Sequence, residues 1–421
     1  MHTLRDWLAY IERQHPKNIE MGLERVHEVH VRMALQKPAA HVVTVGGTNG
    51  KGSTVAFVES IARSAGLRVG AYTSPHLLRY NERVRIDRDE ASDGDLLAAF
   101  EAVEAARGAT PLTYFEFGTL AALWLFQRAG LDLAVLEVGL GGRLDAVNVV
   151  DPDVAVITTV DIDHVEWLGP DRESIGFEKA GIARPWKPLV LGEVDSPASV
   201  LRHAYAIGAN AIRLGSDYFH ESIDAERWRW REVGMEMTLP TPVLAAPAQR
   251  SNAAAAIAAL RALPLEITPE AFERGVAAAS LPGRLQRFDL DGVRMVLDVA
   301  HNPQAARELA AWLRSTPSSA RTLAVFAVLA DKDVRGIVNA LSEHVSRWLL
   351  AGLESAGGRG QTVDALASKL QDTAAAHGAH HATVADALRA ARAAALHGDR
   401  ILVFGSFHTV AQALVLLHSG A

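Results

Sequence analysis

Short apolar runs alternate with longer amphipathic segments along most of the chain. The apolar runs have the length and the Val, Leu and Ala content of buried strands, and they lie at residues 41–46, 131–138, 153–160, 188–192, 294–299, 322–329, 347–351 and 400–405. Segments with helical periodicity separate them, at residues 54–65, 91–107, 116–129, 196–207, 251–263, 303–314, 363–374 and 383–396. Strands that alternate with helices form right-handed βαβ units, so the pattern predicts an α/β fold with parallel sheets covered by helices.

Two interruptions of this pattern indicate how the chain is organised. Residues 208–248 alternate apolar and polar positions and contain prolines at 240, 242 and 247, which favours a small antiparallel insertion. A turn-forming segment, Ser-Leu-Pro-Gly-Arg at 280–284, comes before a second series of strands. A chain of 421 residues is long enough for two domains. We therefore expect a first domain at 1–281, a hinge at 282–287 and a smaller α/β domain at 288–421.

The segment Gly-Thr-Asn-Gly-Lys-Gly-Ser-Thr at 47–54 lies between a predicted strand and a predicted helix. Backbone N–H groups and a helix N-terminus in this arrangement can hold a polyphosphate, with Lys51 at the β- and γ-phosphates and the hydroxyl of Ser53 or its neighbour near magnesium. The segment departs from a standard Walker A loop, because Val45 stands where the first glycine is required and Gly52 separates the lysine from the hydroxyls. The alternative is a glycine-rich turn with a surface lysine, and the flanking strand and helix favour the phosphate loop.

Polar side chains follow two further strands, at the edge where open parallel sheets collect ligands. Glu137 ends an apolar run and precedes a glycine-rich segment, so it could bind a hard cation or be an ordinary acid in a turn. His164, in Asp-Ile-Asp-His at 161–164, could bind a metal through an imidazole nitrogen, although a lone histidine is more often structural. Its position one strand after Glu137 favours the metal interpretation.

Lys179 and two later positions are further candidates. Lys179 lies in an apolar setting, where a lysine either extends to the surface or, when buried with a lowered pKa, can take up CO₂ as a carbamate that binds metals like a carboxylate. Asp298 ends a predicted strand and could hold ribose hydroxyls, and His301 could lie at the phosphates. Asn302 and the proline after it also predict a helix cap, which is compatible with both roles. The segment 405–409 repeats this pattern at the last strand.

Composition narrows the function classes without selecting one. The chain is 49% hydrophobic and 22% charged, as in ordinary globular proteins, and its formal net charge of −7 argues against nucleic-acid or membrane-surface binding. It has no cysteine, which excludes disulfides and thiolate metal sites and fits a reducing cytoplasm. The N-terminus lacks the layout of a signal peptide, and no apolar stretch reaches the ~20 residues that span a bilayer. We therefore expect a cytoplasmic protein with small-molecule partners and neither nucleic-acid nor membrane partners.

Taken in order, the motifs resemble one family. The matching segments are 47–54, 74–77, 81–84, 113–116, 136–148, 163–164, 178–181, 282–284, 298–303 and 405–410. They cover the chain from one end to the other, and Gly52 between the loop lysine and Ser53 is typical of the folate branch. The chain is thus similar to the folylpolyglutamate synthase/dihydrofolate synthase family of the Mur ligase superfamily. One departure is Val147, where Thr is expected before Asn148.

The resemblance implies an ATP-dependent, ADP-forming acid–amino-acid ligase with a P-loop parallel-sheet N-terminal domain and a Rossmann-like C-terminal domain that carries the amino acid. Such an enzyme would add L-glutamate to dihydropteroate and to reduced folates through an acyl phosphate, as a monomer, using ATP and two Mg²⁺ ions. The implied ATP contacts are Asn49, Gly50, Lys51, Gly52, Ser53, Asn252, Arg284 and Asp298. The implied metal ligands are Ser74 and Glu137 at one magnesium, and His164 and carbamylated Lys179 at the other. The implied catalytic residues are Lys51, Lys179, His164 and His301.

The resemblance also implies where the pterin binds. The residues concerned are Gly22, Leu23, Glu24, Arg25, Thr113, Tyr114, Phe115, Glu116, Leu144, Asp145 and Ala146. Two alternatives stay open: a monofunctional folylpolyglutamate synthase or another Mur-type amino-acid ligase, and a P-loop NTPase or ATP-gated binding module without ligation. Segment 113–116 and Gly52 favour the folate branch, and a second α/β half with Asp298 and His301 argues against a bare NTPase.

Overall fold

The computed structural model describes residues 2–17, 19–316 and 320–419, and the chain divides into two compact units. The first unit contains residues up to 243 together with 249–280, and the second contains residues 244–248 and those from 281 onward. The sequence analysis placed 244–248 in the first domain, whereas Ala245 and Ala246 pack against the core of the second unit. The expected hinge at 282–287 stays a prediction.

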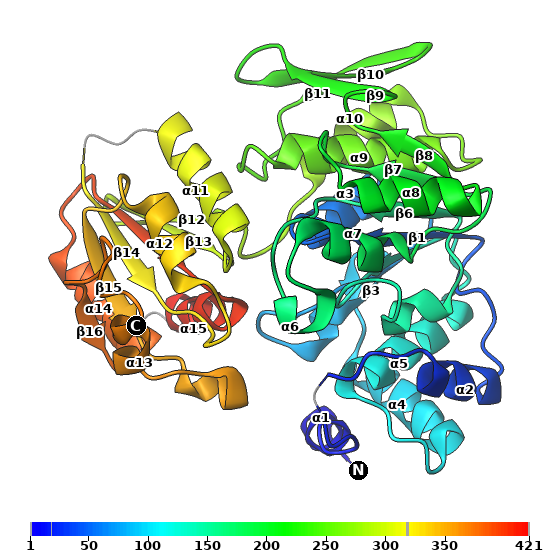
Figure 1. Ribbon diagram of the computed structural model, residues 1–421, viewed down its shortest axis with the longest axis horizontal. Helices are drawn as coiled ribbons and strands as arrows, with labels where there is room; N and C mark the ends of the chain where they lie inside the picture. The colour runs from blue at the N-terminus through cyan, green and yellow to red at the C-terminus, as the bar shows by residue number, and fades with distance from the viewer. Residues whose placement is uncertain (1, 18, 317–319, 420–421) are drawn as a thin grey trace. The chain divides into compact units, whose positions relative to one another are not determined.

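A twisted sheet of eight strands forms the centre of the first unit (Figure 1). The strands are β1 (His41–Gly46), β2 (Val69–Tyr72), β3 (Val84–Ile86), β4 (Asp89–Glu90), β5 (Leu133–Glu137), β6 (Val154–Ile157), β7 (Pro188–Leu191) and β8 (Asn210–Arg213). Their order is β4-β3-β2-β5-β1-β6-β7-β8, and every neighbouring pair from β2 to β8 is parallel. Strands β3 and β4 continue the sheet in antiparallel pairing. The predicted α/β fold with a parallel sheet is confirmed.

Helices surround this sheet, and a small second sheet follows it in the chain. The helices are α1 (Leu4–Ile11), α2 (Glu24–Arg32), α3 (Lys51–Ser64), α4 (Asp93–Arg107), α5 (Tyr114–Ala129), α6 (Val165–Leu168), α7 (Arg172–Ala180), α8 (Ala198–Ile207), α9 (Gln249–Arg261) and α10 (Pro269–Ala278), with 3₁₀ turns at Tyr80–Arg83 and Ala146–Val149. The antiparallel insertion consists of β9 (Tyr218–Ser222), β10 (Arg227–Glu232) and β11 (Met235–Pro240). It starts later than the predicted 208–248, because residues 210–213 pair with β7 in the main sheet.

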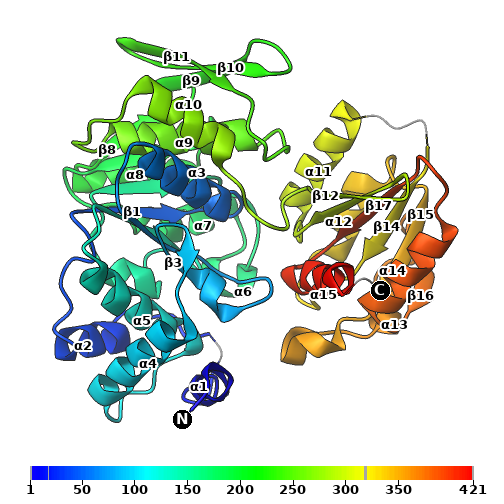
Figure 2. The ribbon, with the colours of Figure 1, turned by 180° about the vertical axis from the view of Figure 1, so that it is seen from behind.

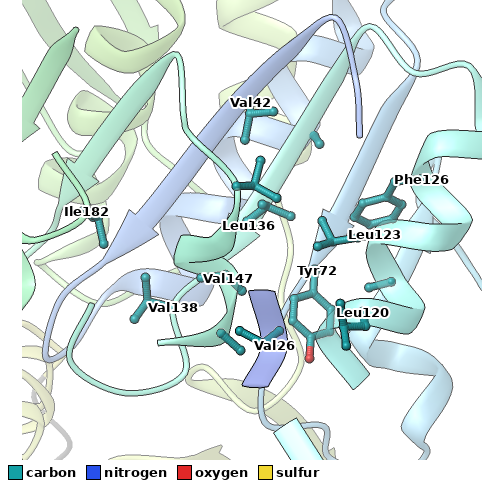
Figure 3. Packing of buried hydrophobic residues seen from close by; sticks show 14 of the residues in the cluster. Val26, Val42, Tyr72, Leu120, Leu123, Phe126, Leu136, Val138, Val147 and Ile182 are labelled. Atoms are coloured by element: carbon teal, nitrogen blue, oxygen red, sulfur yellow. The ribbon is translucent and has the colours of Figure 1, made fainter. Parts of the chain in front are cut away.

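The core of the first unit forms where apolar side chains of α5 meet the sheet (Figure 3). Leu120, Leu123 and Phe126 recur at helical spacing on α5, and all three are buried. They lie beside Tyr72 of β2, while Leu136 of β5 belongs to the same cluster. Helix α5 thus covers part of one face of the sheet with buried apolar side chains.

The second unit repeats the α/β plan on a six-stranded sheet (Figure 2). Its strands are β12 (Gln286–Leu290), β13 (Val293–Asp298), β14 (Thr322–Phe326), β15 (Arg347–Ala351), β16 (Ala379–His381) and β17 (Arg400–Phe404), in the order β12-β13-β17-β14-β15-β16. All pairs are parallel except β12 with β13. The helices are α11 (Pro303–Ser315), α12 (Val334–Leu341), α13 (Val363–Ser368), α14 (Val384–Ala394) and α15 (Phe407–His418), with a 3₁₀ segment at Glu354–Arg359.

One predicted helix of the second unit is too long. The periodicity extends over 363–374, but α13 ends at Ser368. The N–H groups of Lys369 and Leu370 bond to carbonyls only three residues back, at Leu366 (3.1 Å) and Ala367 (3.0 Å), so the helix passes into turns. Thr373 continues these turns, because its hydroxyl donates to the carbonyl of Leu370 (2.8 Å) and accepts from the N–H of Ala375 (3.3 Å). A threonine side chain that bonds to its own backbone neighbourhood competes with helix hydrogen bonds and favours a turn.

The contact between α10 and α3 yields a stability prediction. A Cβ at Gly275 of α10 would lie 2.4 Å from the Cα of Ile61 in α3, so Gly275→Ala forces two helix backbones apart. We expect a loss of about 1–3 kcal/mol of unfolding free energy, measured at the first transition of a urea titration. The matched control is Gly94→Ala in α4, where the nearest atom would be 3.7 Å away and the change should be neutral or stabilising. Equal stability of the two variants would contradict the packing argument.

Candidate active site

Two glycines let the loop between β1 and α3 approach its neighbours closely. Gly47 has φ +146°, and a Cβ there would lie 1.8 Å from Oγ1 of Thr158. Gly50 has φ +90° and caps the N-terminus of α3, and a Cβ there would lie 2.5 Å from Oδ1 of Asn252. Any other residue would clash at both positions, so glycine allows the loop to lie against Thr158 and Asn252 at the N-terminus of α3. This contact also brings Asn252, a predicted nucleotide contact on α9, to the loop.

The side chain of Lys51 folds back over this loop. Its Nζ donates to the carbonyl oxygens of Gly47 (3.0 Å) and Thr48 (3.3 Å). Gly52 and Ser53 follow in the first turn of α3, and both are buried. A positive charge beside a helix N-terminus forms an electrostatic site for phosphate groups.

Hydrogen bonds tie the loop to the segment that follows β6. The hydroxyl of Thr158 donates to the carbonyl of Asn49 (2.6 Å), and the hydroxyl of Thr159 accepts from the N–H of Asn49 (3.2 Å). Thr48 bonds to Asp161 in the same way, because its hydroxyl donates to the Asp161 carbonyl and accepts from the Asp161 N–H, both at 3.0 Å. The sequence analysis missed these threonines. The available signal was the threonine pair at 158–159, which the sequence analysis placed inside the predicted strand 153–160, whereas β6 ends at Ile157.

Ser74 and Glu137, the predicted ligands of one magnesium, lie together. Glu137 is the last residue of β5 and is buried, and its Oε2 accepts a hydrogen bond from the N–H of Ser74 at 3.1 Å. Val45, at the end of β1, is its register partner, so Glu137 lies one strand away from the phosphate loop. The contact is made by the backbone of Ser74, and the carboxylate of Glu137 and the hydroxyl of Ser74 are both hard oxygen groups of the type that magnesium prefers.

Lys179, predicted at the other magnesium, is buried on α7. Burial and, to a smaller extent, the charge of Lys51 lower the pKa of Lys179 from 10.5 to about 7, while Asp163 and Glu193 act in the opposite direction. His164 follows Asp163 and has φ 51°, an unusual backbone for a histidine. Within residues 2–17, 19–316 and 320–419, no group of three or more His, Cys, Asp or Glu could hold a metal. A carbamate on Lys179 would supply a carboxylate-like oxygen ligand at this position.

Arg172 and Glu193 hold the segment that carries Asp163 and His164, and sequence reasoning missed both. Glu193 accepts from the N–H of Val160 (2.9 Å), while Nε of Arg172 donates to the carbonyl of the same residue (2.8 Å). The two side chains also form an ion pair at 3.5 Å. Arg172 begins α7, so the backbone after β6 and the helix of Lys179 are fixed to one another. No motif marks this pair, because its partners are backbone atoms.

The three segments predicted to bind the pterin lie together. The N–H of Gly22 donates to the carbonyl of Leu144 (3.4 Å). Arg25 forms an ion pair with Glu116 (Nη2 to Oε1, 2.8 Å), whose Oε2 accepts from the N–H of Thr113 (2.8 Å). Thr113 in turn caps α5. Leu23 and Glu24 begin α2, and Ala146 begins a 3₁₀ turn.

Aromatic rings and a buried acid characterise this region. The ring of Phe115 lies so close to Gly139 that a Cβ there would be 2.7 Å from it, and the ring centroid is 5.9 Å from that of Tyr72. Tyr114 packs against the guanidinium of Arg83 at 5.4 Å. Asp145 is buried, which raises its pKa to about 7, although the N–H groups of residues 140 and 147 and the charge of Lys51 oppose the shift.

The second unit has its own cluster at the end of β13. Asp298 accepts hydrogen bonds from the N–H groups of Leu285 (2.9 Å) and Ala300 (2.8 Å), and burial raises its pKa while the charge of Arg284 opposes the shift. Nδ1 of His301 lies 2.8 Å from the carbonyl oxygen of Val299. The ring of Phe407 lies beside both Arg284 (5.4 Å) and His301 (6.2 Å). Asn302 caps α11 as predicted, with its side chain accepting from the N–H of residue 305.

Comparisons with known proteins agree along the chain. The "Mur ligase middle domain" family matches residues 45–260, and "Mur ligase, glutamate ligase domain" matches residues 283–407. The dihydrofolate synthase/folylpolyglutamate synthase of Escherichia coli is 46% identical over 98% of this chain and 95% of its own length. The protein of that name from Haemophilus influenzae is 40% identical over 97% of this chain and 96% of its own.

Solved structures give the same picture. E. coli FolC in complex with DHPP and ADP superimposes with a TM-score of 0.94 at 46% identity, over 99% of this chain and 98% of that chain. The Yersinia pestis bifunctional folylpolyglutamate synthase/dihydrofolate synthase complexed with AMPPNP and Mn ion gives 0.92 at 46% identity, with the same coverage of both chains. No helix in the described part of this chain is long and apolar enough to cross a membrane.

Identity of this level over nearly the whole of both chains, with both Mur ligase domains in order, shows that the chain belongs to the dihydrofolate synthase/folylpolyglutamate synthase family of Mur ligases.

Proposed function

We propose that this protein is an ATP-dependent amide ligase that adds L-glutamate to dihydropteroate and to reduced folates. The observation that carries the proposal is the arrangement of the phosphate loop, with Lys51 folded over it, one strand away from the buried Glu137. Structures of relatives support these substrates, because one contains DHPP and ADP and another, of the bifunctional enzyme, contains Mn, AMPPNP and L-glutamate. ADP as a bound nucleotide agrees with an ADP-forming reaction.

The reaction follows from the need to make a carboxylate electrophilic. The substrate carboxylate attacks the γ-phosphorus of ATP, ADP leaves, and an acyl phosphate results. The amine of L-glutamate then attacks the acyl carbon, loses a proton and displaces inorganic phosphate. The Lys51 ammonium and the first N–H groups of α3 stabilise the charge on the transferred phosphoryl group. Asn49, Gly50, Gly52 and Ser53 are proposed to line the phosphates, and Asn252, Arg284 and Asp298 the rest of the nucleotide.

The residues at the strand ends fit two magnesium ions. The buried Glu137 beside Ser74 offers hard oxygen ligands for one ion, and His164 with a carbamate on Lys179 offers ligands for the other. Magnesium supplies charge neutralisation and orientation of the phosphates when it is bound. The lowered pKa of Lys179 supports the carbamate, because the neutral amine is the form that reacts with CO₂. His301 is proposed to stabilise the intermediate or the released phosphate.

The pterin is proposed to bind among the three segments around Phe115 and Asp145. Phe115 offers an aromatic face, and the capped N-terminus of α5 at Thr113 offers polar contacts. Asp145, with a pKa raised to about 7, can accept or donate a hydrogen bond near neutral pH. Gly22, Leu23, Glu24, Arg25, Tyr114, Glu116, Leu144 and Ala146 complete the proposed site. We further propose a cytoplasmic monomer without nucleic-acid partners.

Product mass tests this function directly. The protein is incubated with dihydropteroate or a reduced folate, ATP, magnesium and L-glutamate, and we expect each product to gain one or more glutamate residues. Addition to the reduced folate alone would indicate a monofunctional folylpolyglutamate synthase. Phosphate release that ignores glutamate would indicate an NTPase. The variant Lys51→Ala should fold normally but form product about 100-fold more slowly or worse, because the transferred phosphoryl group loses one charged contact.

The carbamate has a pH signature of its own. Because the pKa of Lys179 is about 7, the neutral amine increases as the pH rises through that value, and the carbamate should increase with it. We expect a carbamate signal in ¹³C NMR after labelling with ¹³C-bicarbonate, strong near pH 8 and weak near pH 6. Lys179→Arg should abolish the signal, while Lys332→Arg, a change at another buried lysine, should keep it. A signal that survives Lys179→Arg would refute the assignment.

Acyl phosphates hydrolyse, so the reaction needs protection from water. We propose that segment 282–287 is a hinge about which the two units close when ligands are bound. AMPPNP, magnesium and a pterin ligand together should change the small-angle X-ray scattering profile of the protein. Each ligand alone is the control, and an unchanged profile at saturation with all of them would argue against closure.

A further inference from the structure

Three arginines of the second unit lie on one face of its sheet, on the neighbouring strands β12, β13 and β17. Arg294 of β13 and Arg400 of β17 are register partners, so their side chains share a face. Arg287 of β12 pairs with Val296, two residues after Arg294, and so belongs to the same face. Helix α11 lies beside β12 and β13 in both views (Figures 1 and 2). Its Trp312 receives the guanidinium groups of Arg400 at 5.0 Å and Arg287 at 5.7 Å from the ring centroid.

Arg400 is buried without an acid to balance its charge. The residue is 3% exposed, and within the described part of the chain its hydrogen-bond partner is the carbonyl of Thr316 (2.7 Å). Burial lowers the pKa of Arg400, and the charges of Arg294 and Arg287 lower it further. A buried cation that is surrounded by other cations destabilises the fold unless something compensates its charge.

Two buried donors in this cluster have no acceptor among the described residues. They are Nε of Arg400 and Nε1 of Trp312, and Trp312 is 2% exposed. The side chains of Arg287 and Arg294 are exposed and make no hydrogen bond or ion pair with any residue that the structure describes. Asp289 is the nearest acid in register, opposite Arg294, and it forms no ion pair with Arg294 within 4.0 Å in the described chain. The cluster thus presents donors and positive charge and is short of acceptors.

We propose that Arg287, Arg294 and Arg400 form a binding site for a phosphate group on the second unit, separate from the ligation site. Guanidinium groups bind phosphate oxygens through paired N–H donors, and they do so better than an ammonium group. Arg294 and Arg400 lie at the amino ends of β13 and β17, whereas Asp298 ends β13 and His301 follows it; Arg287 of the antiparallel β12 pairs with Val296, between the two ends. Four residues of extended strand separate Arg294 from Asp298 by roughly 13 Å, and the guanidinium of Arg287 lies over the Trp312 ring that it shares with Arg400. The proposal does not depend on the proposed ligase activity.

Calorimetric titration with inorganic phosphate tests the site. The full-length protein is first saturated with AMPPNP and magnesium to fill the phosphate loop, and the ionic strength is held constant with chloride. We expect Arg287→Gln/Arg294→Gln to weaken phosphate binding at least tenfold, since two charged donors are lost. The matched control is Arg335→Gln/Arg389→Gln, which removes the same charge from exposed arginines that already pair with Asp372 and Asp386. Binding equal to wild type in the first variant, or no phosphate heat above the chloride blank in the wild type, would overturn the proposal.

A stability measurement probes the buried arginine. Arg400→Met removes an uncompensated buried charge and keeps the bulk, so the variant should be as stable as the wild type, or more so, without phosphate. Phosphate should raise the unfolding temperature of the wild type, because a ligand that binds the native state stabilises it, and should not raise that of Arg400→Met. Both measurements use AMPPNP-saturated protein. An equal rise in both proteins would place the phosphate elsewhere and refute the site.

Discussion

The close approach of the phosphate loop to the ends of β6 and α9 is the constraint on which the rest of the first unit's site depends. Gly47 lies against Thr158 and Gly50 lies against Asn252, at distances that leave no space for a Cβ. The hydroxyls of Thr158 and Thr159 then bond to the backbone of Asn49, so the loop is held by buried polar contacts. A buried hydrogen-bonding group that loses its partner costs roughly 1–3 kcal/mol, so these contacts favour one loop conformation strongly. The same hydrogen bonds also position the segment after β6, which carries Asp163 and His164.

Three buried groups near this edge of the sheet have pKa values close to neutral pH. Burial moves the pKa of Lys179 down to about 7 and the pKa values of Asp145 and Glu193 up to about 7. Each group is opposed by a neighbour of opposite charge, as Lys51 opposes the shift of Asp145. Several buried groups that titrate in one range are typical of functional sites, because a bound charge can then change their protonation at low cost. A structural ion-pair network would instead move the pKa values of its acids and its bases apart.

The sequence allowed a correct prediction of features that depend on local periodicity and on strand ends. The eight apolar runs correspond to strands, and Gly47 to Ser53, Glu137 and Lys179 lie where parallel strands and their helices place them. The errors and omissions have other causes. The segment after Ser368 forms turns, with a side-chain bond at Thr373 that periodicity does not reveal. Residues 210–213 joined the main sheet through pairing with β7. Arg172 and Glu193 act on the backbone of Val160, and no residue pattern encodes a backbone partner.

The uncompensated charge of Arg400 does not reflect a lack of acids nearby. Asp399 precedes it directly, is buried, and pairs with Arg321 at 2.6 Å, so an ion pair forms one residue away. The N–H groups of Leu396 and Arg321 also donate to Asp399, which leaves its carboxylate fully engaged. Successive side chains in extended backbone point to opposite faces, so Asp399 cannot serve the face on which Arg400, Arg294 and Arg287 meet. The charge of Asp399 is therefore paired, whereas the charge of Arg400 beside it is not. A buried, unpaired arginine destabilises the fold relative to an apolar residue of similar size. An anionic ligand that binds to Arg400 offsets this destabilisation, which is a physical reason for an arginine at this position.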